Sequence, residues 1–92
     1  MNKVFLDKPG INIDALDFSQ KIEKHSINIA GHATSVTLEP LFWELLKQIA
    51  AIEKKALRTL IEKIDDGRTH NLSCAIRIYI MTFFLEKFSK NP

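Results

Sequence analysis

The chain has 92 residues, of which 46% are apolar, and a formal net charge of +2. A chain of this length forms one small domain that buries roughly 60–65% of its unfolded surface, so its stability is marginal unless it oligomerises. The single cysteine, Cys74, excludes an intrachain disulfide and favours an intracellular setting. No apolar run reaches the length of a membrane span, and the acidic N-terminal region is unlike a signal peptide. We therefore expect a cytoplasmic protein.

The charge is distributed unevenly along the chain. Residues 1–40 carry four basic and five acidic side chains, whereas residues 41–92 carry nine basic and six acidic ones. Neutralisation of phosphates supplies most of the non-specific affinity of a protein for DNA. The balance therefore predicts weak binding to arbitrary DNA, and any strong binding would depend on specific contacts.

Residues 1–23 are predicted to form an N-terminal arm. Their apolar side chains are scattered without a sustained period, and Pro9-Gly10 interrupts the segment. We expect an extended segment that lies on the body of the protein or is partly mobile.

Two short alternating segments follow the arm. Residues 26–30 read Ser-Ile-Asn-Ile-Ala, and residues 34–38 read Thr-Ser-Val-Thr-Leu, so apolar side chains alternate with small polar ones in both. Gly31 lies between them and permits a positive φ. The pattern predicts either a hairpin with its turn at Gly31-His32 or one continuous bent strand.

The period changes to that of a helix at Pro40, since proline is well tolerated in a first helical turn. A first helix is predicted from Pro40 to about Lys54. A second periodic stretch runs from Ala56 to Asp65 and ends before Gly67. No Gly, Pro or Asn separates the two stretches, so they form either one long helix or two helices with a bend near Lys54-Lys55.

Asn71 is a favourable N-cap for a last helix that reaches about Phe88. Apolar side chains cover nearly the whole circumference of this helix: Leu72, Ala75, Ile76, Ile78, Tyr79, Ile80, Met81, Phe83, Phe84, Leu85 and Phe88. A helix that is apolar all round must be buried on most sides, which a chain this small cannot achieve alone. We therefore predict a homodimer with this helix at or near the two-fold axis.

Together these elements predict a mostly α fold with a short N-terminal β segment. The order of strand, helix and a helix opening Asn-Leu-Ser-Cys-Ala-Ile-Arg resembles the ribbon-helix-helix DNA-binding proteins, a fold of many bacterial repressors and antitoxins. The run from Ala30 to Pro40 is similar to the Ile-Ala-Gly-His-x-Thr-Ser-Val-x-Leu-Glu-Pro run of a bacterial subfamily. The similarity spans about residues 24–86. It implies a bacterial protein that forms a ribbon-helix-helix dimer with an additional helix. The ribbon-helix-helix domain would cover residues 24–88, and residues 89–92 would form a C-terminal tail.

The resemblance implies that two subunits pair their strands into an antiparallel ribbon that enters the major groove of double-stranded DNA. The groove-facing, base-contacting positions are Ala33, Ser35 and Thr37. The core-facing positions are Thr34, Val36 and Leu38. Ser and Thr discriminate bases weakly beside Arg or Asn. Strong sequence specificity therefore depends on whether His32, Lys24 or Asn28 also reaches the DNA.

A second feature of this family is a helix N-terminus whose backbone N–H groups bind a DNA phosphate. Two segments compete for this role. We favour Asn71, Leu72 and Ser73, which makes residues 56–65 an insertion; the alternative is the N-terminus beside Lys54 and Lys55. The residues expected in the dimer core are Val36, Leu38, Ile76, Ile80, Phe83 and Phe84.

Nothing in the sequence predicts an enzyme, because no phosphate-binding loop and no recognisable catalytic set of Ser, Cys or His occurs. The histidines and Cys74 lack the tight spacing of metal ligands, so we expect neither a metal site nor a cofactor. Arg77 is flanked by apolar residues and is expected to pair with Glu39 or Asp65, since a buried unpaired charge is costly.

Two classes of function fit these observations. The first is a dimeric, sequence-specific DNA-binding regulator. The second is a dimeric protein-interaction module, such as an antitoxin-like protein or adaptor, that binds an unidentified protein partner and has weak or no affinity for DNA. The near-neutral charge favours the second, whereas the pattern of residues 34–38 and the family resemblance favour the first.

Overall fold

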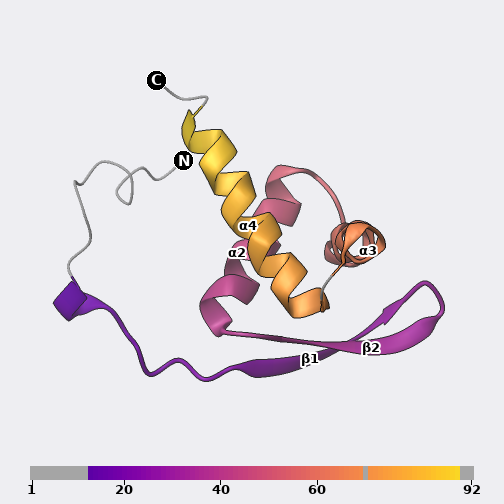
Figure 1. Ribbon diagram of the computed structural model, residues 1–92, viewed down its shortest axis with the longest axis horizontal. Helices are drawn as coiled ribbons and strands as arrows, with labels where there is room; N and C mark the ends of the chain where they lie inside the picture. The colour runs from indigo at the N-terminus through magenta and orange to yellow at the C-terminus, as the bar shows by residue number, and fades with distance from the viewer. Residues whose placement is uncertain (1–12, 70, 90–92) are drawn as a thin grey trace.

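The computed structural model describes residues 13–69 and 71–89. The elements in these ranges are a one-turn 3₁₀ helix, η1 (Ile13–Ala15), strands β1 (Glu23–Ile29) and β2 (His32–Leu38), and helices α2 (Pro40–Ile52), α3 (Leu57–Gly67) and α4 (Leu72–Ser89). The two strands form an antiparallel sheet, and the three helices lie on one side of it (Figure 1). This confirms the predicted class, a mostly α fold with a short β segment.

The strands are joined by a two-residue turn, so the alternative of one bent strand is wrong. Ala30 and Gly31 both have positive φ, 52° and 86°. Two consecutive positive φ angles define a turn whose twist matches that of the flanking strands. The register pairs Ile29 with His32 next to the turn and Glu23 with Leu38 at the open end. One chain thus forms a two-stranded ribbon by itself, and the pairing of strands between two subunits stays a prediction.

Helix α2 ends two residues earlier than predicted. Lys54 adopts a left-handed conformation with φ of 57°, its N–H donates to the carbonyl of Ala51, and the N–H of Lys55 donates to that of Ala50. These two bonds make a Schellman motif, which satisfies the last carbonyls of a helix and ends it. The stretches that the sequence left open as one helix or two are therefore two helices.

The core lies between the helices and one face of the hairpin, and every described strand and α-helix contributes to it. Its buried side chains are Ile29, Val36, Leu38, Leu46, Ile49, Ala50, Leu60, Ile61, Leu72, Ile76 and Ile80. Helix α3 packs on β1, and α4 packs on β2. Because the inward side chains of both strands lie under helices, the opposite face of the hairpin is left to solvent.

Helix α4 buries one stripe and exposes another. Its buried stripe includes Ile76 and Ile80. Four apolar side chains on the other side remain more than half exposed: Ile78, Met81, Leu85 and Phe88. A single chain therefore covers only part of the apolar circumference, as the sequence predicted.

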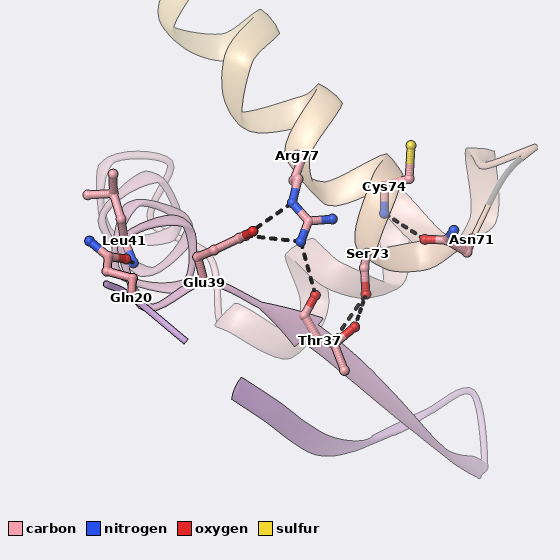
Figure 2. Close-up of polar contacts among 8 residues, drawn as sticks. All are labelled: Gln20, Thr37, Glu39, Leu41, Asn71, Ser73, Cys74 and Arg77. Atoms are coloured by element: carbon pink, nitrogen blue, oxygen red, sulfur yellow. Dashed lines mark hydrogen bonds and ion pairs between the residues drawn. The ribbon is translucent and has the colours of Figure 1, made fainter. Parts of the chain in front are cut away.

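The described part of the arm, residues 13–22, is exposed throughout. A hydrogen bond from the N–H of Leu41 to Oε1 of Gln20, at 3.0 Å, ties it to the body (Figure 2). Leu41 lies in the first turn of α2, where backbone N–H groups lack a helical partner. Gln20 therefore caps this helix from outside it. The breaker at Pro9-Gly10 lies outside the described residues.

Candidate nucleic-acid interface

The solvent face of β2 carries the three residues expected to face DNA. Ala33, Ser35 and Thr37 are exposed, whereas Val36 and Leu38, which alternate with them, are fully buried. Because successive side chains of a strand point to opposite faces, the predicted groove-facing residues lie on the solvent face and the predicted core-facing residues lie on the inner face. Thr34, on the inner face, is half-buried.

Strand β1 adds three more side chains to the same face. The register places Lys24 opposite Thr37, Ser26 opposite Ser35, and Asn28 opposite Ala33. Residues directly opposite each other in an antiparallel pair point to the same side of the sheet. All three of these β1 residues are exposed.

The sequence offered only a weak signal for this set, the alternation of polar and apolar residues from Lys24 to Ile29. Of the three residues that could have supplemented the ribbon, the hairpin brings Lys24 and Asn28 to its solvent face. His32 pairs with the buried Ile29 and has the opposite parity, so it belongs to the other face.

The N-terminus of α4 is bonded to the edge of this ribbon (Figure 2). The hydroxyl of Ser73 accepts a hydrogen bond from the N–H of Thr37 at 3.0 Å and lies 3.3 Å from the Thr37 hydroxyl. Asn71 caps the helix as the sequence predicted, since its Oδ1 accepts the N–H of Cys74 at 2.8 Å. The helix N-terminus and the ribbon face thus meet at one end of β2.

The other segment considered for phosphate contact lies elsewhere. Residues 53–56 connect α2 to α3 by an arch on the side of the molecule away from the hairpin (Figure 1). Lys54 and Lys55 within this arch also form the C-terminal cap of α2. Within one subunit, the N-terminus of α4 and the arch with Lys54 and Lys55 therefore lie apart.

An ion pair between Arg77 and Glu39 holds α4 to the junction of β2 and α2. Nε and one terminal nitrogen of Arg77 donate to the same carboxylate oxygen at 3.2 and 3.0 Å, and that terminal nitrogen lies 3.5 Å from the carbonyl of Thr37 (Figure 2). Asp65, the other candidate partner, pairs instead with Arg68 at 2.6 Å. The pair fixes the strand-to-helix corner that presents the ribbon.

The pKa of the Glu39 carboxyl lies below its usual value, because its own backbone N–H and the Arg77 guanidinium donate hydrogen bonds to the charged form. A carboxyl whose folded-state pKa is depressed stabilises the fold above its unfolded pKa, and this contribution is lost as the pH falls through the folded value. We expect the free energy of unfolding of the wild type to fall more steeply below about pH 4.5 than that of Glu39→Gln. Denaturant titrations from about pH 7 to about pH 3 measure this difference.

Glu44→Gln is the matched control for that comparison, because Glu44 makes only an exposed contact with Lys47 on the same helix. Its pH profile should follow the wild type. Parallel profiles for wild type and Glu39→Gln would contradict a structural role for the pair.

Four of the six residues expected in a dimer core are buried within the single chain. Val36, Leu38, Ile76 and Ile80 are at most 1% exposed, so they have almost no surface left for a partner. Phe83 and Phe84 are half-buried against the same core and keep some surface. The four buried residues can affect an interface only indirectly, because they hold α4 and β2 in place.

Within residues 13–69 and 71–89 no group of three or more His, Cys, Asp or Glu side chains is placed to bind a metal ion. In the same ranges no helix is both long and apolar enough to cross a membrane.

The model of the ribbon-helix-helix domain family matches residues 22–84, which include the hairpin, α2, α3 and most of α4. No curated protein and no solved structure matches the chain. A match over more than half of the chain, together with the antiparallel ribbon and the helices packed on one of its faces, assigns the family. The chain belongs to the ribbon-helix-helix domain family.

Proposed function

We propose that this protein is a dimeric, sequence-specific DNA-binding protein of the bacterial cytoplasm, a transcriptional regulator and not an enzyme. It inserts the β1–β2 ribbon into the major groove. The observation that carries the proposal is the exposed polar face of the ribbon, with the N-terminus of α4 bonded to its edge through Thr37 and Ser73. Residues 24–88 form the DNA-binding domain.

The dimensions of the ribbon support this proposal. The major groove is about 12 Å wide and admits a two-stranded β-ribbon. Adjacent strands lie about 4.8 Å apart, so a hairpin with its outward side chains fits into that width. The outward side chains are uncharged except for Lys24, so specific contacts rather than bulk charge would supply most of the affinity.

The first turn of α4 is the proposed phosphate contact. Backbone N–H groups in a first helical turn lack internal partners and carry the positive end of the helix dipole. The amides of Leu72 and Ser73 are in this position, and their neighbour Thr37 lies on the base-facing strand. A ribbon seated in the groove would bring them to its phosphate wall. Residues 53–56, which include Lys54 and Lys55, lie on the side of the molecule away from the hairpin, so they are not part of this proposed contact.

The proposed dimer interface is the exposed stripe of α4. Cys74, Ile78, Met81, Leu85 and Phe88 recur at intervals of four, three, four and three residues, the spacing of a helix-pairing seam. Burial of the same stripe of a second copy would remove the largest apolar surface that α4 leaves in water.

The test of DNA binding is a fluorescence anisotropy titration against the promoter upstream of the protein's own gene. We expect Ser35→Ala combined with Thr37→Ala to weaken binding roughly 30-fold, because each of the two lost hydrogen bonds contributes about 1 kcal/mol. Thr82→Ala is the control, since it removes an exposed hydroxyl from the middle of α4. Equal binding by wild type and the double variant, or no binding by either at low salt, would overturn readout by the ribbon.

The second candidate is a protein-interaction module of the antitoxin or adaptor kind. It is favoured by four exposed apolar side chains of the described arm: Ile13, Leu16, Phe18 and Ile22. Exposed apolar groups in a short segment are typical of a partner-binding motif. If this candidate is correct, the wild type does not bind its promoter. In a pull-down from cell lysate, a Leu16→Asp, Phe18→Asp variant then recovers less of the partner protein than the wild type does.

A further inference from the structure

We propose that a hollow between the C-terminal end of α2 and the second half of α4 is a binding site for a small organic amine. Its volume is about 400 Å³, and its lining residues are Glu53, Tyr79, Thr82, Phe83, Glu86 and Lys87. Pockets that hold small molecules have volumes of about 300–1,000 Å³. The residues that line it are not those of the ribbon or of the first turn of α4, so this inference goes beyond the proposed function and does not depend on it.

Two carboxylates give the rim of the hollow a negative charge. Glu53 is the C-cap residue of α2, and Glu86 lies near the end of α4; both are exposed. The ion pairs among the described residues use other acids: Glu23, Glu39, Glu44 and Asp65. The C-terminal end of a helix also carries a partial negative charge, which adds to that of Glu53. An ammonium group that enters the hollow would therefore meet two carboxylates that have no cationic partner in the described part of the chain.

Two aromatic rings line the hollow beneath these carboxylates. Tyr79 and Phe83 lie one turn apart on α4, their ring centroids are 6.4 Å apart, and both side chains are half-buried. The ammonium of Lys87 lies 5.4 Å from the centroid of the Phe83 ring, so one of the rings already holds a cation of the same chain. Aromatic faces attract ammonium groups, and they also pack against apolar groups. The rings therefore suit a ligand that combines an ammonium with an apolar body.

The hydroxyl of Tyr79 adds a neutral polar group to the hollow. Burial raises the pKa of Tyr79, and the negative charge of Glu53 raises it further. The phenol therefore stays protonated at neutral pH, and its oxygen can accept an N–H.

The charge of the lining matches a ligand with one ammonium group. Two carboxylates and the ammonium of Lys87 give −2 and +1, a net charge of −1. Carboxylate and hydroxyl oxygens accept hydrogen bonds, and a primary ammonium has three N–H groups to donate. The ligand class is thus a primary monoamine with a compact apolar or aromatic body.

The experiment uses the only tyrosine of the chain as the reporter. Incorporation of fluorotyrosine places a single fluorine label at Tyr79, and fluorine NMR follows its signal during titration. The probe is phenethylamine, with phenethyl alcohol and phenylpropionate as neutral and anionic compounds of similar size. We expect the amine to shift the signal saturably at about millimolar concentration or below. The alcohol should bind roughly 10-fold more weakly, since it lacks the charge-assisted hydrogen bonds, and the anion should not bind.

Charge variants test the same site in both directions. Glu53→Gln and Glu86→Gln should each weaken binding of phenethylamine roughly 5-fold, because each removes one attractive charge. Lys87→Met should tighten binding, because it removes a like charge and keeps the length of the side chain. Glu44→Gln is the matched control, since Glu44 is an exposed carboxylate on α2 that does not line the hollow. Thermal melting of each variant verifies that it is folded.

Three results would overturn the inference. The first is the absence of a saturable shift when the wild type is titrated with phenethylamine. The second is equal affinity for the amine and the alcohol, which would show an apolar hollow without preference for a cation. The third is unchanged affinity for the amine in both glutamine variants, which would place the ligand away from Glu53 and Glu86.

Discussion

Replacement of Met81 and Leu85 by glutamate is expected to convert the proposed dimer into monomers. These side chains are 54% and 59% exposed in the single chain and lie at the centre of the proposed seam on α4. A dimer of this variant would bury four carboxylates in an apolar interface, and burial of unpaired charge is costly. We expect the dissociation constant of the dimer to rise on the order of 100-fold or more, as measured by light scattering coupled to size-exclusion chromatography.

Thr59→Glu is the control for that experiment, because it adds a glutamate at an exposed polar position on α3. It should remain dimeric. Circular dichroism distinguishes a folded monomer from an unfolded chain. A wild type that is monomeric at micromolar concentration would refute the proposed dimer, and a double variant that stays dimeric would place the interface elsewhere on the molecule.

Truncation of Ile76 is expected to have the largest effect on stability. Its side chain is fully buried beside residues of β2 and the other helices. Removal of a buried isoleucine to alanine leaves a cavity and costs about 2–5 kcal/mol. A small domain has a total stability of about 5–15 kcal/mol, so Ile76→Ala should unfold at markedly lower denaturant concentration. Urea titration followed by circular dichroism measures the change.

Ile52→Ala removes the same atoms from a site that is 52% exposed, at the end of α2. It should cost less than about 1 kcal/mol, since most of its surface is already in water. Similar losses for the two variants would show that the core is not organised around α4. A small loss for both would show that Ile76 is not buried in solution.

Local patterns in the sequence were sufficient for most element boundaries. Pro40 marks the first residue of α2, Asn71 caps α4 with its side chain, and Gly67 ends α3. Each of these depends on residues within one or two turns, where capping chemistry and proline geometry act directly. The end of α2 was missed because Lys54 fills the left-handed position that usually holds glycine.

The candidate site was only half accessible to sequence reasoning. The alternation of residues 34–38 distinguished the exposed face of β2 from its buried one, because strand parity is local. It could not show that Lys24 and Asn28 share this face, since that depends on the register of the hairpin. Nor could it choose between the two carboxylates available to Arg77. That choice follows from how the corner at Glu39 meets α4.

The sequence by itself determined the order of the elements, their periods and the family, because these reside in runs of neighbouring residues and in a motif of more than ten positions. The tertiary structure alone decided that β2 pairs with β1 of its own chain, and that α4 buries one apolar stripe and exposes the other. The physical reason is that strand partners and buried faces are set by contacts between residues far apart in the chain. When a helix is apolar all round, its sequence does not indicate which side will be buried against the rest of the protein.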